Sequence, residues 1–200
     1  MDKHAAAEHP VHELIARRWS PVCFDGKAVT DEDLRSLLEA VRWAASSYNE
    51  QPWHFLVATK REPEGFEKLL SCLLEGNQQW ASAAPVLVMT VAGMRFARNG
   101  KDNCAAFHDI GLAVGNLLLE ATARGLAVHQ MIGILPERAR EVFEIPEDYE
   151  PLTALAIGYR GEGEAHSEGL RHRDQSPRQR KALREFVFSG TWGKVSGIVA

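Results

Sequence analysis

The feature that most constrains the fold is a long apolar segment between residues 103 and 124. It is rich in Ala, Leu and Gly, and it carries little charge apart from Asp109 and Glu120. Gly125 follows it and is a typical C-terminal cap of a helix. A helix that is apolar around most of its circumference has to be buried. Gly111 and Gly115 lie about one turn apart, so they allow a second helix to approach closely. We therefore expect a buried helix that forms part of a subunit interface.

Helices and strands alternate on both sides of this segment. Thr30 and Asp33 form a capping box, and apolar residues then recur at helical spacing as far as Ala45. We expect further helices over residues 11–19, 63–74 and 136–143, and strands over residues 53–59, 85–91, 126–131 and 152–159. The polar run at 76–79 is expected to end the second of these helices, and residues 93–103 and 161–176 are expected as loops. This order predicts helices layered on a sheet.

Composition excludes several functional classes. The chain has 200 residues, of which 45% are apolar and 25% charged, as expected for a single soluble domain. A net charge of -4 argues against nucleic acid as a partner. Three widely spaced cysteines and the histidine spacing indicate neither a disulfide framework nor a metal site. We find no signal peptide and no apolar run near the roughly 20 residues of a membrane helix, so we expect a cytoplasmic protein without a membrane partner. Residues 1–10 are expected to be disordered.

A polar segment lies between the helix that begins at Thr30 and the first strand. Ser46, Ser47, Asn49 and Gln51 can all hydrogen-bond a flat heterocycle or its polar chain, and none is a strong acid or base. Pro52 follows and favours an extended backbone at Gln51. The composition of this turn predicts a cofactor-binding segment, with no catalytic triad.

Two groups of arginines lie far apart in the sequence. Arg17 and Arg18 precede Trp19, Ser20 and a proline, where they either complement a helix C-terminus or bind a phosphate with a bidentate fork. The second group lies in the basic segment 171–184 and includes Arg178 and Arg180. That segment is either solvated and mobile, or it brings one or two arginines to an anionic cofactor.

Residues 46–53, read as S-S-x-N-x-Q-P-W, resemble a segment of the nitroreductase family, the FMN-dependent NAD(P)H oxidoreductases. Further motifs occur in the order found in that family: Arg18-Trp19-Ser20 with Phe24, the helix containing Asp109 and Gly111, the G-L-x-x-H-Q-M-x-G run at 125–133, and Arg180-Lys181-Ala182-Leu183. The chain departs from the family pattern at Val22, where a basic residue is usual, and at Ala45 and Ala182, where proline is usual. The resemblance covers most of the chain, from Arg17 to Trp192.

The resemblance implies a fold and a set of cofactor contacts. The fold is an α+β three-layer α-β-α sandwich with a mixed central sheet and helices on both faces. Residues 1–200 form one domain, and residues 177–200 form an arm exchanged in a homodimer. The expected FMN-binding residues are Arg17, Arg18, Trp19, Ser20, Ser46, Ser47, Asn49, Gln51, Gln130, Met131, Ile132, Gly133, Arg178 and Arg180. Val22 implies either a weaker grip or replacement by another arginine, and Val22→Arg is expected to tighten FMN binding.

The leading functional hypothesis is two-electron, ping-pong transfer from NADH or NADPH through FMN to a small aromatic acceptor, a nitroaromatic or a quinone. We expect no catalytic amino acid, because hydride transfer to a flavin requires none, and we expect no metal. The chain lacks G-x-G-x-x-G, so the nicotinamide is expected to share the FMN site. Two alternatives are other flavin chemistry (dehydrogenation, dehalogenation or flavin breakdown) and a non-catalytic flavin-binding protein. His129 is either a residue of the flavin segment or a satisfied core histidine.

Overall fold

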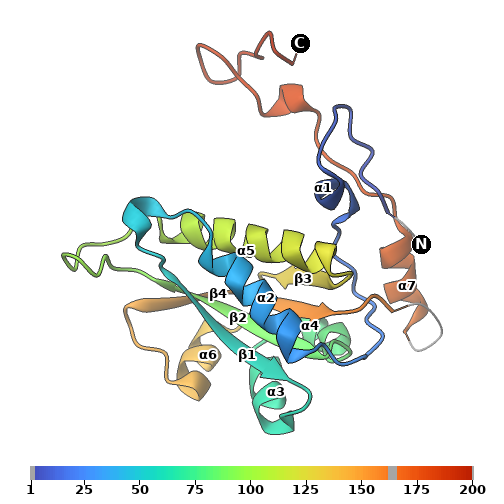
Figure 1. Ribbon diagram of the computed structural model, residues 1–200, viewed down its shortest axis with the longest axis vertical. Coiled ribbons are helices and arrows are strands. Elements are labelled where there is room, and N and C mark those ends of the chain that lie inside the picture. Colours follow the sequence, from blue (N-terminus) through green and yellow to red (C-terminus); the bar gives the residue numbers. More distant parts are fainter. Residues whose placement is uncertain (1–2, 162–165, 200) are drawn as a thin grey trace.

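The computed structural model describes residues 3–161 and 166–199 and shows a sheet covered by helices on both faces (Figure 1). The strands are β1 (Trp53–Thr59), β2 (Val86–Gly93), β3 (Ala127–Met131) and β4 (Tyr149–Gly158), in the order β1-β2-β4-β3. Helices α2 (Asp31–Arg42) and α5 (Ala106–Ala123) cover one face, and α3 (Pro63–Leu70), α4 (Glu75–Ala81) and α6 (Pro136–Phe143) cover the other. The expected α+β three-layer sandwich is confirmed.

The expectation of a mixed sheet needs one correction. Each of the pairings β1–β2, β2–β4 and β3–β4 is antiparallel within the described residues. The physical reason is visible at the first connection. Thr59 at the end of β1 pairs with Val86 at the start of β2, because α3 and α4 together return the chain to the end of the sheet that it left.

The core has one half on each face of the sheet. Successive side chains of a strand point to opposite faces. Val88 therefore packs with Leu37 and Leu117 from α2 and α5, while its neighbour Met89 packs with Phe66 on the α3 side. The predicted cap of α2 is confirmed, because Thr30 Oγ1 accepts a hydrogen bond from the Asp33 amide at 3.0 Å.

Two expectations about local structure were wrong, and one expected helix is shorter than predicted. The helix expected over 63–74 ends at Leu70, and the polar run at 76–79 lies inside α4, where Trp80 is buried and anchors the helix. The loop expected over 161–176 contains α7 (Glu168–Gln175), which Ser167 caps through the Leu170 amide. Helix α1 covers only Glu13–Arg17 and buries none of its residues.

One face of α5 is left exposed by the rest of the chain. Phe107 is 53% exposed and Leu112 is 41% exposed. A Cβ atom built on Gly111 or Gly115 meets nothing within 4 Å outside the helix itself. The chain therefore buries one side of this apolar helix and presents the other.

The last part of the chain extends away from the body of the molecule (Figure 1). It contains η2 (Leu183–Glu185) and an isolated pairing of Phe188 with Val195, and it leaves Trp192 and Ile198 more than nine-tenths exposed. In the described part of the chain, no helix has the length and apolar character needed to cross a bilayer.

Candidate functional site

An arginine cluster lies beside the end of α1. Arg18 Nη1 donates a hydrogen bond to Ser20 Oγ at 3.1 Å. Burial lowers the pKa of Arg18, and the charges of Arg178 and Arg180 lower it further. Burial and the charge of Arg180 also lower the pKa of Arg178. The structure therefore brings the two groups of arginines together, and an anion bound here would relieve their mutual repulsion.

The two C-terminal arginines of the cluster differ in how they are held. Arg178 Nη1 donates to the carbonyls of Lys3 and Ala16, each at 2.7 Å, and so ties both chain ends together. Arg180 donates to the neighbouring Gln179 carbonyl and remains exposed. Arg180 is thus freer to turn toward a ligand.

The cluster adjoins the outer edge of β3. His129, on that strand, donates from Nδ1 to the Pro21 carbonyl at 2.8 Å, which fixes the Ser20–Pro21 segment against the strand. Its ring lies 4.5 Å from Trp80, and burial lowers its pKa. These contacts favour the interpretation of His129 as a satisfied core residue.

The predicted site residues at 130–133 differ in how exposed their side chains are. Gln130 and Ile132 are exposed, whereas the Met131 side chain is buried in the core. Gly133 packs tightly, since a Cβ there would lie 2.5 Å from Asn77 Nδ2. Only Gln130 and Ile132 therefore offer their side chains at this edge, and Met131 and Gly133 can offer backbone.

Val22 does not occupy a position that a basic residue could take. Its side chain is fully buried, at 0% exposure, and its amide donates to the Asp174 carboxylate at 2.9 Å. The Cys23 amide donates to the same carboxylate at 3.0 Å. An arginine at position 22 would bury a charge, so the burial of this position argues against the expectation that Val22→Arg tightens FMN binding.

Sequence reasoning overlooked Asp174 as an anchor of the arginine segment. Together with burial, this carboxylate raises the pKa of the Cys23 thiol to about 11. Asp174 is the only acid between Arg171 and Arg184, and that isolation was the available signal.

The polar segment 46–51 has an unusual backbone. Tyr48, Asn49 and Gln51 all have positive φ, at 54°, 57° and 52°. Such angles cost roughly 1–3 kcal/mol each in a non-glycine residue, so surrounding contacts have to hold them. The Ser47 amide donates to Asp109 Oδ2 at 2.9 Å, and the Gln51 amide donates to Ser46 Oγ at 3.0 Å. Asn49 and Gln51 remain exposed, so their amide groups are presented to whatever lies outside.

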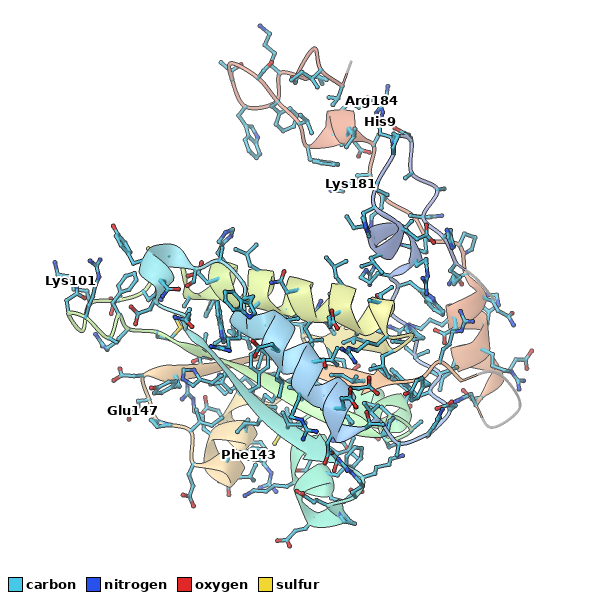
Figure 2. The ribbon with its side chains drawn as sticks, in the orientation of Figure 1. His9, Lys101, Phe143, Glu147, Lys181 and Arg184 are labelled. Carbon is cyan, nitrogen blue, oxygen red and sulfur yellow. The ribbon has the colours of Figure 1, made fainter. Side chains whose placement is uncertain are left out.

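The arginine cluster and the polar segment lie at opposite ends of α5. Asp109, which holds Ser47, is in the first turn of α5, whereas Arg17, Arg18 and Trp19 line a cavity of about 480 Å³ with Thr122 in its last turn. An 18-residue helix is about 27 Å long. Figure 2 shows the same separation, with Lys101 near the polar segment and Lys181 on the arm near α1. One chain does not bring the two predicted halves of the site together.

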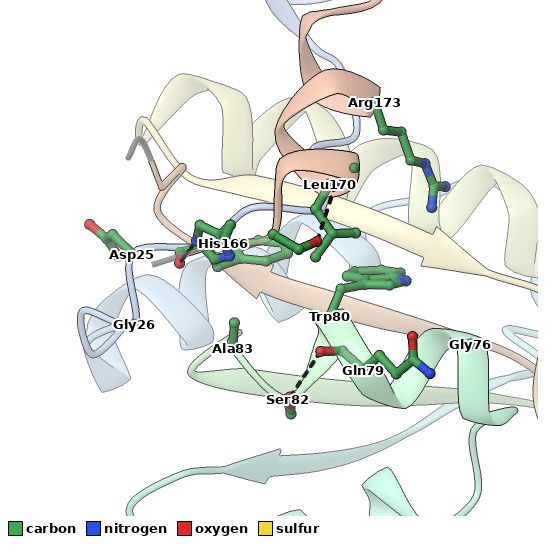
Figure 3. Close-up of a pocket in the computed structure, with 13 residues that line it drawn as sticks. Asp25, Gly26, Gly76, Gln79, Trp80, Ser82, Ala83, His166, Leu170 and Arg173 are labelled. Carbon is green, nitrogen blue, oxygen red and sulfur yellow. Dashed lines mark hydrogen bonds between the residues drawn. The ribbon is translucent and has the colours of Figure 1, made fainter. Parts of the chain in front are cut away.

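A second cavity, of about 750 Å³, lies between α4, α7 and the Phe24 region (Figure 3). His166, Leu170 and Arg173 lie on one side of it, and Gln79 and Ser82 lie on the other. None of the predicted cofactor residues lines it. No group of acidic, histidine or cysteine side chains suited to a metal ion occurs among residues 3–161 and 166–199.

Comparison with known proteins shows what this chain is similar to. The model of the "Nitroreductase family" matches residues 15–159. The crystal structure of an oxidoreductase containing FMN superposes with a TM-score of 0.87 at 32% identity, over 94% of this chain and 96% of the other. A putative nitroreductase from Desulfovibrio desulfuricans, solved in complex with FMN, superposes with a TM-score of 0.70 at 25% identity, over 93% and 99% of the two chains. The major NAD(P)H-flavin oxidoreductase of Aliivibrio fischeri is 28% identical over 90% of this chain and 98% of its own.

Proposed function

This chain belongs to the nitroreductase family, and from that premise we propose that it is an FMN-dependent oxidoreductase. It takes two electrons from NADH or NADPH and passes them to a flat aromatic acceptor, a nitroaromatic or a quinone. The observation that carries the proposal is the arginine cluster of Arg18, Arg178 and Arg180 beside the edge of β3.

The cluster suits a phosphate for electrostatic reasons. Arg18 is partly buried, and the two other arginines are the charged groups that lower its pKa. Guanidinium groups bind phosphate oxygens through charge-assisted, often bidentate, hydrogen bonds. Ser20 Oγ, already bonded to Arg18, has a hydroxyl proton that can be donated to the same anion. A phosphomonoester therefore fits here better than a neutral ligand.

The residues that would hold the ring of the cofactor are those at the outer edge of β3. Gln130 and Ile132 are exposed there, and the edge continues from the arginine cluster through the His129–Pro21 contact. Bound FMN supplies the hydride-accepting chemistry, and the side chains of this protein bind it, orient it and limit its exposure to water.

We propose further that a complete site needs two copies of the chain. Asn49 and Gln51 are suited to the polar edge or ribityl chain of FMN, but within one chain they lie at the opposite end of α5 from the arginine cluster. The exposed apolar face of α5 and the extended arm both need a partner surface. In a symmetric homodimer, the polar segment of one chain can meet the arginine cluster of its partner.

The test begins with the purified protein as expressed. A flavin absorption spectrum, release of FMN on heating, and bleaching by NADH or NADPH under anaerobic conditions are the expected results. Recovery of FAD, or an apo-protein that does not take up FMN, would contradict the cofactor assignment. Flavin that no nicotinamide donor bleaches would leave FMN binding intact and favour the alternative flavin chemistries.

A further inference from the structure

Tyr48 and Arg98 form a stacked pair at the rim of the polar segment. The Arg98 guanidinium carbon lies 4.0 Å from the centroid of the Tyr48 ring and 5.3 Å from that of Phe96. Phe96 in turn packs edge-on against Tyr48, with ring centroids 6.0 Å apart. Tyr48 is 74% exposed, so the pair faces solvent.

The pair is fixed in place by a hairpin between β2 and α5. Residues 94–103 fold back on themselves, with Arg95 paired to Asp102 and the Phe96 amide donating to the Lys101 carbonyl at 2.8 Å. The Ala97 amide donates to Glu50 Oε1 at 2.6 Å, which docks the hairpin onto the polar segment. The position of Arg98 is therefore set by the same contacts that support the strained backbone.

Arg98 differs from Arg95, the other arginine of the hairpin, in its interaction partners. Arg95 is tied to Asp148 at 2.7 Å and to Asp102 at 3.1 Å. Arg98 has no carboxylate partner among residues 3–161 and 166–199, and aromatic rings alone hold it. A guanidinium stacked on a ring keeps its full charge and its in-plane N–H donors. The Arg98 guanidinium is therefore available to bind an anion.

The proposed FMN phosphate already has its own cations in the arginine cluster, which within one chain lies at the opposite end of α5 from the polar segment and Arg98. The anion left for Arg98 is therefore one that arrives with a substrate. Nitroaromatic and quinone acceptors are uncharged in their simple forms, whereas a nicotinamide dinucleotide carries phosphate groups.

We propose that Arg98, held on Tyr48, binds a phosphate group of the nicotinamide donor. This inference rests on the proposed function and adds a donor-recognition residue outside the FMN contacts. It predicts that binding of the donor depends on Arg98 and that binding of the acceptor does not.

The experiment compares donors with and without phosphate. KM would be measured for NADPH, for NADH and for 1-benzyl-1,4-dihydronicotinamide, in the FMN-loaded parent and in Arg98→Ala. We expect KM for the two dinucleotides to rise about tenfold in Arg98→Ala, the effect of losing one charge-assisted hydrogen bond. KM for the benzyl compound should stay unchanged. Added salt should raise the KM for NADPH in the parent more than in the variant.

Two further variants make the test specific. Lys101→Ala removes a positive charge from the same hairpin without touching the pair, and it should leave the KM for every donor near the parent value. Tyr48→Phe keeps the ring under Arg98 and should behave like the parent, whereas Tyr48→Ala should reproduce the loss seen in Arg98→Ala.

Three results would overturn the inference while leaving the proposed function intact. An equal rise in KM for all donors would mean that Arg98 acts only by supporting the polar segment. Release of FMN from Arg98→Ala would mean that Arg98 holds the cofactor phosphate. Unchanged KM for the dinucleotides would mean that it binds neither. A parent protein that oxidises none of the three donors would refute the proposed function itself, and this inference with it.

Discussion

The amide of Ser47 donates a hydrogen bond to the buried carboxylate of Asp109 at 2.9 Å, and these residues lie 62 positions apart in the sequence. Asp109 is 2% exposed and is in the first turn of α5. Through this bond, the central helix sets the conformation of the segment that carries Asn49 and Gln51. Apolar packing alone would not fix the left-handed backbone of the following residues.

Asp109→Ala should therefore loosen the polar segment. Loss of a hydrogen bond to a charged group costs about 1.5–3 kcal/mol of unfolding free energy. FMN should also bind more weakly, since the strained backbone at Tyr48–Gln51 loses a support. Urea unfolding and FMN titration measure both effects. Asp109→Asn keeps an acceptor oxygen, so it should retain most of the stability and FMN affinity that Asp109→Ala loses. If Asp109→Ala equals the parent in both assays, the prediction is contradicted.

Arg18→Ala should weaken FMN binding about 10- to 150-fold, because it removes a charge-assisted hydrogen bond worth roughly 1.5–3 kcal/mol. Arg18→Lys keeps the charge but lacks the bidentate fork. Its affinity for FMN should lie between that of the parent and that of Arg18→Ala. Fluorescence titration of the apo-protein with FMN measures the change. Arg42→Ala is a suitable control, since its guanidinium pairs with Glu39 on the exposed side of α2. Parent-like affinity in Arg18→Ala would remove Arg18 from the phosphate site.

Gly115→Leu should convert the proposed homodimer into a monomer. Within one chain, a Cβ at Gly115 meets nothing within 4 Å outside α5, so the substitution is tolerated there and removes a helix-destabilising glycine. If α5 packs on a partner, the leucine has to clash with that partner. Sedimentation velocity measures the outcome, and Gly65→Leu in α3, equally open, is the control. A Gly115→Leu protein that remains a dimer would place the interface elsewhere.

His129 should make the protein less stable at mildly acidic pH. Burial lowers its pKa in the folded state, so the unfolded chain, with a pKa near 6.5, takes up the proton first as the pH falls. The stabilising contribution is complete above about pH 6.5 and is lost as the pH falls toward the lowered folded-state value. Urea unfolding at several pH values should show a steeper decline for the parent than for His129→Gln. Parallel pH dependences would exclude His129 as the cause.

Steady-state kinetics should show parallel double-reciprocal lines when NADPH is varied at several fixed quinone concentrations. Two flat molecules cannot occupy one exposed ring face together, and the chain has no second nucleotide-binding fingerprint. The donor therefore has to leave before the acceptor binds. Menadione would serve as the acceptor, and intersecting lines would indicate a ternary complex with a separate acceptor site.

The sequence by itself determined the elements whose physics is local. The Thr30 cap and the helical spacing of Leu34 to Ala45 specify α2, and the apolar run from Val86 to Val91 specifies a strand buried on both faces. The residues alone left two interpretations of Arg18 and Ser20 open, and the choice of a phosphate site came from the family resemblance and stays a prediction.

Tertiary structure alone decided the rest, because the deciding contacts are distant in sequence. Val22 is a core residue whose amide is held by Asp174, 152 positions away in the sequence. The positive φ angles at Tyr48, Asn49 and Gln51 persist because Asp109 and the hairpin residue Ala97 are bonded to the segment that contains them. The two halves of the site are separate within one chain because they lie at opposite ends of α5. No local pattern encodes such distances, since they arise when the whole chain packs.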